Sequence, residues 1–314
     1  MIRLKHRLHV VFTPGTVSLL KYGLLSFLKY SNLQLRVISN GLDDAEFGRV
    51  ASLCERSERL TVQRFPTRKI VPHGTILQSL FQECDESHFY FMDSDIFALC
   101  ELDEPLRRAS AGCDIFSSCS NARRDPAKKG VGLGGLATVS PSGLPVAASF
   151  FAIYDTRRTR ALMETHGVTF ERYLGPEQLP PSVRDRFQEA DRAEGQVYDT
   201  GKALSLLASY SGYRVKHEQL EELLHLGRMS IGAPDKGPKA ARSKQRHTRP
   251  GGAMRDYFGE ILLSADRGEE FPEIALDPDA WAGVEDAEAE MERTRAAGRR
   301  VHEVVRQLKL EYGV

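Results

Sequence analysis

The chain has 314 residues, with 43 Lys and Arg against 43 Asp and Glu. This balance creates no net field that would attract nucleic acid or an anionic membrane, so we expect neither as a partner. A hydrophobic share of 41% and a charged share of 27% are typical of a soluble globular protein, and no apolar run is long enough to span a bilayer. The five cysteines show no zinc-ligand spacing, which predicts reduced thiols in a cytoplasmic protein.

Short apolar runs alternate with helical patterns through the first hundred residues. Residues 8–12 end at the turn sequence Thr13-Pro14-Gly15-Thr16 and predict a strand, and residues 17–30 then have apolar side chains at helical spacing. This alternation is typical of a mostly parallel sheet with helices on both faces, where ligands bind at the carboxyl ends of the strands. The pattern predicts strands at 8–12, 35–39, 60–66 and 89–97 and helices at 17–30, 45–54 and 75–84.

The last of these strands, at 89–97, contains two carboxylates within an otherwise apolar pattern. Asp93 and Asp95 are two positions apart, so in a strand both side chains leave on one side and that of Ser94 on the other. Two buried carboxylates raise each other's pKa unless a cation lies between them. The pair therefore predicts a site for Mn²⁺ or Mg²⁺. The alternative is a strand end with two solvated acids.

Beyond residue 100 the alternation is less regular. Residues 228–255 carry many basic side chains among Gly and Pro and almost no apolar residue, which predicts a mobile loop. The glycine-rich residues 130–135 follow no strand of a strand-helix-strand unit, so we interpret them as a loop rather than a dinucleotide site. The pattern predicts helices at 101–108, 157–166, 196–210 and 218–225, strands at 114–118, 149–154 and 213–217, and a polar surface segment at 171–193.

The C-terminal residues 284–312 show a heptad-like pattern. Apolar or small side chains recur every three or four residues, at positions 284, 287, 291, 294, 298, 301, 305, 308 and 312. A terminal helix packed on its own domain and a short seam between two copies of the chain both fit this spacing. We therefore expect a helical tail and keep a homodimer as one of two interpretations.

Four segments together resemble the GT-A glycosyltransferases, enzymes that use nucleotide sugars and hold a metal ion through an Asp-x-Asp motif. Phe91-Met92-Asp93-Ser94-Asp95 is similar to that motif. Tyr198-Asp199 is similar to the family's acidic position near the acceptor, with Tyr where Glu is usual. His225-Leu226-Gly227-Arg228-Met229-Ser230 is similar to the C-terminal His motif, and Ser142-Gly143-Leu144-Pro145 to the acceptor-side loop.

The resemblance implies a GT-A, Rossmann-like catalytic domain at 1–264 and a C-terminal helical extension at 265–314. Within the domain it implies a nucleotide-binding half at 1–100, an acceptor half at 101–230 and the basic loop at 228–256. Asp93, Asp95 and His225 would hold Mn²⁺ or Mg²⁺, and Asp199 would be the catalytic base of an inverting transfer. Donor contacts are expected from Thr13, Pro14, Asn40, His73, Asp93, Ser94, Asp95, Arg228, Lys236 and Lys239.

The expected function is metal-dependent transfer of a sugar from a nucleoside diphosphate, most often UDP in this family, to a saccharide, natural product or peptide. The assigned residues have simpler alternatives: His225 can meet the negative end of a helix, and Asp199 can cap one. Two other functions stay open. A sugar-nucleotidyltransferase has a similar sheet but needs a phosphate loop after the first strand, and a non-catalytic nucleotide-sugar or metal-binding scaffold could dimerise through the tail.

Overall fold

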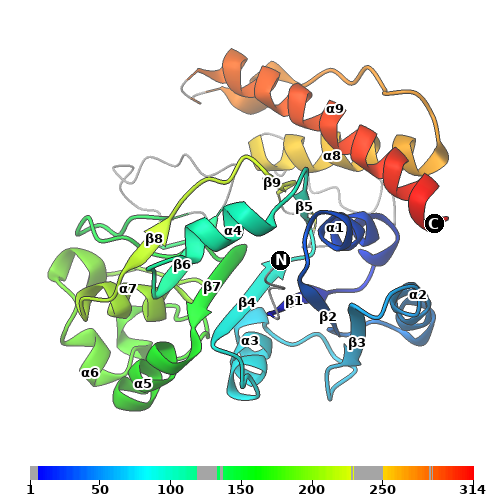
Figure 1. Cartoon of the computed structure of the whole chain (residues 1–314). Helices are drawn as coiled ribbons and strands as arrows, with labels where there is room; N and C mark the ends of the chain where they lie inside the picture. Colours follow the sequence, from blue (N-terminus) through cyan, green and yellow to red (C-terminus); the bar gives the residue numbers. More distant parts are fainter. Residues whose placement is uncertain are drawn as a thin grey trace.

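The main sheet of the chain has strands in the order β3-β2-β1-β4-β7-β6-β8 (Figure 1). The computed structural model describes residues 6–118, 133–134, 137–227, 229, 250–282, 284 and 286–314. Within this part of the chain only β7 runs against its neighbours, so the sheet is mostly parallel and the predicted α/β class is confirmed. The strands are β1 (Arg7–Phe12), β2 (Gln34–Ser39), β3 (Leu60–Arg64), β4 (His88–Asp93), β6 (Ile115–Ser118), β7 (Phe151–Asp155) and β8 (Val215–His217).

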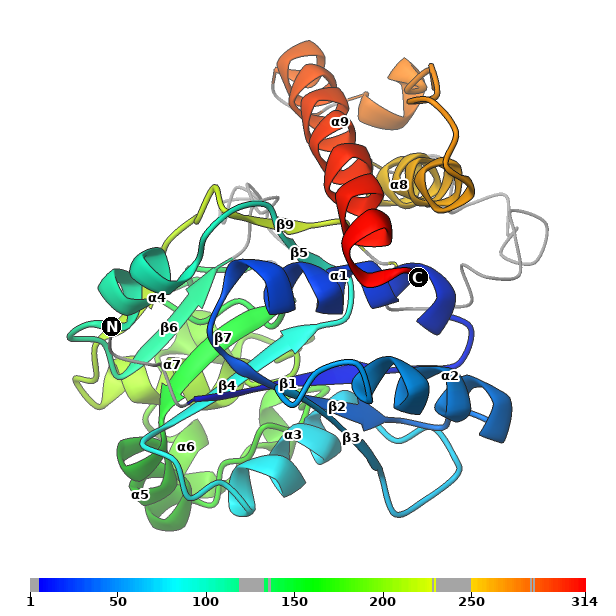
Figure 2. The ribbon, with the colours of Figure 1, turned by 45° about the vertical axis from the view of Figure 1, so that its right-hand side comes forward.

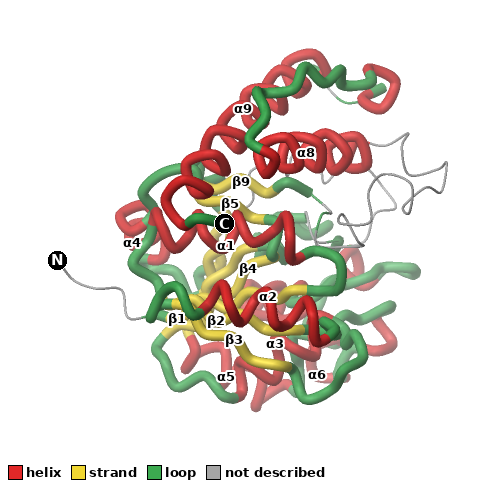
Figure 3. Tube along the Cα trace, turned by 90° about the vertical axis from the view of Figure 1, so that its right-hand side faces the viewer, coloured by secondary structure: helices red, strands yellow, loops and turns green. Residues whose placement is uncertain are grey.

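Helices cover both faces of this sheet, as Figures 2 and 3 show. A hydrophobic core lies on each face of the sheet. Strand β4 contributes to both cores, because Tyr90 and Met92 point into the first and Phe89 and Phe91 into the second. The first core is closed by α1 (Val17–Tyr30), α2 (Asp44–Cys54) and α4 (Asp103–Ser110), and the second by α3 (His73–Gln82), α5 (Thr156–His166) and α7 (Lys202–Tyr210). Short helices follow α5: η1 (Pro176–Gln178), α6 (Pro181–Arg184) and η2 (Glu189–Arg192).

The stretch predicted as one strand at 89–97 is two strands separated by a turn. β4 ends at Asp93, Ser94 and Asp95 form the turn, and β5 (Ile96–Ala98) pairs antiparallel with β9 (Leu223–His225) in a second, two-stranded sheet. The predicted single strand was therefore wrong, and so was the helix at 218–225. A short leucine-rich run is compatible with a buried strand as well as a helix, and here pairing with β5 decides the outcome.

Two further boundaries differ from the predictions. α7 begins at Lys202 rather than at 196, because Gly201 takes a left-handed conformation with φ 73° and ends the extended segment before the helix. The loop expected at 228–255 is helical from Pro250, where α8 (Pro250–Arg267) begins. Proline is well suited to the first helical position, since its missing N–H has no partner there. The division of the chain at residues 100, 230 and 264 stays a prediction.

The C-terminal helices pack on each other and on α1. α9 (Ala287–Tyr312) follows η5 (Pro278–Trp281) and crosses α8 (Figures 1 and 2). Val301, Val305 and Leu308 from the heptad pattern are fully buried within this single chain, in the core shared with α1 and α8. Packing on its own domain thus accounts for these three heptad residues, and the homodimer stays a prediction. No helix in the described ranges is long and apolar enough to cross a lipid bilayer.

Candidate functional site

The carboxyl edge of the parallel strands gathers polar residues from β1, β2 and β4. In the sheet register Val11 lies opposite Asp93 and Phe12 lies opposite Ser39. The residues that follow β1 and β2 therefore leave the sheet at the same edge as the Asp93 carboxylate. This is the edge at which ligands bind in parallel α/β sheets.

Asp93, Asp95 and His225 form a compact ligand set at this edge. One ligand atom from each lies within 4.8 Å of the other two. Asp95 is fully buried in the β4–β5 turn, and its Oδ1 is 3.4 Å from Nε2 of His225. The β5–β9 ladder explains the approach, because it places His225 opposite Ile96. The structure thus brings together all three residues that the sequence predicted as metal ligands.

Backbone groups fix this turn from both sides. The N–H of Met229 donates to Oδ2 of Asp95 at 2.8 Å, and the N–H of Leu226 donates to the Asp95 carbonyl at 3.0 Å. On the other side the N–H of Asp93 donates to the Phe150 carbonyl at 2.7 Å. The Phe150 ring also packs on the His225 ring, with centroids 4.2 Å apart. The sequence assigned no individual role to Phe150 or Met229, because neither side-chain type signals a ligand-holding role.

Gly23 allows α1 to lie directly on the β4–β5 turn. A Cβ at this position would be 2.8 Å from the Ile96 carbonyl oxygen and 3.0 Å from that of Ser94. Both are backbone atoms, so a side chain there would displace the helix or the turn. A glycine within a strongly apolar helix was the available sequence signal for this contact.

The cluster places two carboxylates and an imidazole close together at one point. Burial, and then the charges of Asp95 and Asp199, raise the pKa of Asp93 well above its usual range, while His225 opposes the shift. Two carboxylates and an imidazole facing one another under these conditions are a chemically suitable set for a divalent cation. The sequence pattern and the geometry therefore indicate the same three residues as a candidate metal site.

Asp199 lies in the turn before α7. Its N–H donates to the Leu133 carbonyl and its Oδ1 accepts the Thr200 N–H, both at 2.9 Å. The alternative that Asp199 caps the helix is not what the structure shows, since the N-cap is Gly201 and has no side-chain cap bond. The Asp199 charge acts on both Asp93 and His73, which places the three side chains in one electrostatic cluster.

The predicted donor residues have unequal surroundings. The Asn40 side-chain amide donates to the Val71 carbonyl at 3.0 Å and accepts the Val71 N–H at 2.8 Å, so it fixes the segment after β3. The Ser94 hydroxyl is buried and forms no hydrogen bond within the described residues. Thr13 and Pro14 follow β1 and are half-buried. Arg228, Lys236 and Lys239 lie outside the described residues, and the donor contacts of the whole set stay a prediction.

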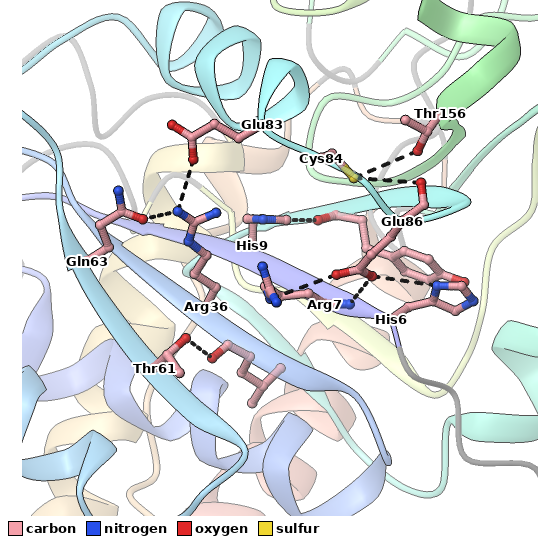
Figure 4. A network of polar contacts seen from close by, with 12 residues as sticks. His6, Arg7, His9, Arg36, Thr61, Gln63, Glu83, Cys84, Glu86 and Thr156 are labelled. Carbon is pink, nitrogen blue, oxygen red and sulfur yellow. Dashed lines mark hydrogen bonds and ion pairs between the residues drawn. The ribbon is translucent and has the colours of Figure 1, made fainter.

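The opposite, amino edge of the sheet holds a different polar network, shown in Figure 4. There the Arg7 N–H donates to Glu86 at 2.8 Å, and Arg36 pairs with Glu83 at 3.1 Å. A cavity of about 630 Å³ lies beside this network. Its lining has charges of both signs: Arg7, Gln34, Arg36, Thr61, Glu83 and Asp85.

Among the comparisons with known proteins, only the one with solved structures found similar proteins. No family model and no curated protein sequence matches the chain. The mannosyltransferase PcManGT from Pyrobaculum calidifontis, in complex with GDP-Man and Mn²⁺, is 13% identical over 97% of this chain and 87% of its own, with a TM-score of 0.43. Residues 1–349 of TarS from S. aureus, in complex with UDP-GlcNAc, are 16% identical over 98% of this chain and 91% of their own, with a TM-score of 0.38.

A third solved structure is that of the galactosyltransferase LgtC with donor and acceptor sugar analogues. It is 14% identical over 67% of this chain and 72% of its own length, with a TM-score of 0.40.

Proposed function

We propose that this chain is a metal-dependent glycosyltransferase that moves a sugar from a nucleoside diphosphate, UDP in the first instance, to an acceptor hydroxyl. The observation that carries the proposal is the cluster of Asp93, Asp95 and His225 at the carboxyl edge of a mostly parallel sheet, with Asp199 nearby. A diphosphate leaving group is stabilised by a nearby metal cation, and this cluster supplies ligands for such a cation.

The ligand set favours Mn²⁺ as the first ion to test. Two carboxylates and one imidazole form a mixed oxygen and nitrogen set, whereas Mg²⁺ prefers oxygen ligands and water. When bound, the ion would act as a Lewis acid for the leaving diphosphate. Thr13, Pro14 and Asn40 would border the nucleobase at the ends of β1 and β2, and Arg228, Lys236 and Lys239 would bind the phosphates.

Asp199 would take the acceptor proton. In an inverting transfer the acceptor oxygen bonds to the anomeric carbon as the bond from that carbon to the diphosphate breaks, and the hydroxyl proton passes to a base on the acceptor side. Asp199 is half-buried, and its Oδ1 is held by the Thr200 N–H at 2.9 Å. Its second oxygen has no hydrogen bond from the described residues, which suits a group that must accept a proton.

Local structure weighs against the two alternative functions. A nucleotidyltransferase would use backbone N–H groups after β1 for phosphate, but the Gly15 N–H donates to the buried carboxylate of Glu46 at 2.6 Å. A carboxylate in this place repels an anion. The scaffold interpretation relied on dimerisation through the tail, and the heptad residues Val301, Val305 and Leu308 are buried within the chain.

A donor panel with and without Mn²⁺ tests the proposal. UDP and GDP sugars should give slow, Mn²⁺-dependent hydrolysis, and an acceptor library of saccharides, natural products and peptides should accelerate release of the nucleotide. Absence of Mn²⁺-dependent binding of any nucleotide to the wild-type protein would overturn the function.

The variant Asp199→Asn tests the base. Because general base catalysis typically contributes about 10²- to 10⁴-fold, transfer should fall by that factor while nucleotide and Mn²⁺ affinities stay at the wild-type level. The matched control is Asp185→Asn, which changes a carboxylate that is 67% exposed on the surface. Turnover of Asp199→Asn equal to that of the control would exclude Asp199 as the base.

A further inference from the structure

We propose that His73 is a positioning residue for Asp93, whose Nδ1–H directs one carboxylate oxygen and leaves the other oriented toward the metal ion. This inference rests on the proposed function, because it concerns the same metal site. It differs from the donor contact that the sequence predicted for His73, since the imidazole would act on a ligand of the ion rather than on the nucleotide.

The geometry comes from the first turn of α3. Nδ1 of His73 is 3.7 Å from Oδ1 of Asp93, a separation that a small movement of either side chain closes to hydrogen-bond length. The His73 ring meets the Phe91 ring edge-on, with centroids 6.1 Å apart and planes at 87°. Phe91 and Asp93 lie on the same face of β4, so the aromatic contact holds the imidazole beside the carboxylate.

The two ring nitrogens of His73 have different surroundings. Nε2 is buried and forms no hydrogen bond within the described residues, whereas Nδ1 faces the Asp93 carboxylate. In a neutral imidazole the single proton is most stable on Nδ1, because the Asp93 carboxylate lies near this nitrogen and Nε2 has no acceptor among the described residues. The imidazole is therefore a fixed donor toward Asp93.

The start of α3 is held by a rigid neighbour. At Gly74 a Cβ would be 2.6 Å from the Phe170 carbonyl oxygen, so the helix rests directly on that backbone segment. The same carbonyl accepts the Gly201 N–H at 3.0 Å, and the Phe170 N–H donates to Gln78 of α3 at 3.2 Å. A positioning residue must itself be held in place by such packing and hydrogen bonds, because a loosely held donor cannot orient a metal ligand.

Two isosteric substitutions separate the roles of the two nitrogens. The amide nitrogen of Asn occupies the place of Nδ1, whereas that of Gln reaches the place of Nε2. Mn²⁺ binding without nucleotide is measured by the electron paramagnetic resonance signal of the free ion, which requires no catalytic activity. Loss of an outer-shell partner typically lowers metal affinity about 10- to 100-fold, so His73→Gln should bind Mn²⁺ at least about tenfold more weakly, and His73→Asn within about threefold of wild type.

The matched control is His166→Gln, which changes a partly exposed histidine at the end of α5. It should bind Mn²⁺ like the wild type, and metal-free thermal unfolding shows that each variant folds. His73→Ala replaces His73→Gln if the glutamine variant does not fold.

Three results would contradict the positioning role. Wild-type Mn²⁺ affinity in His73→Gln would show that Nδ1 does not act on the site. Equal weakening in both variants would indicate packing rather than donation. Weaker nucleotide binding at unchanged Mn²⁺ affinity would assign His73 to the donor. If the wild-type protein itself binds no Mn²⁺, the proposed function fails first, and this outcome is distinct from the other three.

Discussion

Both edges of the central sheet carry carboxylates, but their pKa values are shifted in opposite directions. At the amino edge, the Arg7 N–H and the side chains of His6 and Arg7 surround Glu86 at 2.8 to 3.8 Å (Figure 4). Burial opposes ionisation there, but the neighbouring His6 and the Arg7 contacts keep the pKa of Glu86 below its usual range. At the carboxyl edge, burial and the neighbouring carboxylates raise the pKa of Asp93.

The difference separates carboxylates that lie beside cationic side chains from carboxylates that lie beside one another. At the amino edge, Glu83 and Glu86 each have a cationic partner from the protein itself beside the cavity. At the carboxyl edge, negative charge is gathered around one point where an ion would relieve the repulsion. The clustering of carboxylates, rather than the volume of a cavity, identifies the candidate site.

The largest expected effect comes from removing one charge at each edge. Asp95→Asn keeps an acceptor for the Met229 N–H but loses a metal ligand, so sugar transfer should fall by more than about 100-fold, beyond the usual effect of an outer-shell partner. Glu86→Gln should leave the transfer rate near that of the wild type. Rates at saturating Mn²⁺ measure both. Equal losses in the two variants would remove the distinction between the edges.

Two glycine substitutions test whether the candidate site depends on the close packing of α1 against the β4–β5 turn. Gly23→Ala forces a Cβ against the backbone of the β4–β5 turn and should lower the free energy of unfolding by about 1 to 3 kcal/mol, with weaker Mn²⁺ binding. A Cβ at Gly48 in α2 has no atom within 4 Å, so Gly48→Ala should raise the free energy of unfolding by up to about 1 kcal/mol through its higher helix propensity. Denaturant unfolding measures both. A stable Gly23→Ala with wild-type Mn²⁺ affinity would show that the turn tolerates displacement.

The smallest expected effect is a difference in pH dependence of the metal-free protein. The lowered pKa of Glu86 gives stability that is present above its ordinary pKa and is lost as pH falls through the folded value. The raised pKa of Asp93 acts in the opposite sense, so its contribution declines as pH rises from the ordinary value to the folded one. Unfolding free energies measured against pH in chelator should lose the acid-side slope in Glu86→Gln and the upper slope in Asp93→Asn. Parallel curves for the two variants would contradict the opposite shifts.

Local patterns were sufficient to predict the sheet, its flanking helices and the Asp pair. Strands with continuous apolar runs and helices such as α1 follow from periodicity within a few residues. His225 was identified through resemblance, but its strand was predicted as a helix. The pairing of Ile96 with His225 joins distant parts of the chain, and no local pattern encodes it. Gly23, Phe150 and Met229 act through backbone approach and carbonyl or amide groups, which side-chain chemistry does not reveal.

The β5–β9 ladder also sets when the site can exist during synthesis. Asp95 and its partner Met229 are 134 positions apart, so the two carboxylates leave the ribosome long before the strand that carries the imidazole. Contacts of this separation form late, because the chain between them must first be ordered. Binding of a metal ion at this site would then be a late event of folding, and it would stabilise only chains in which β5 and β9 have already paired.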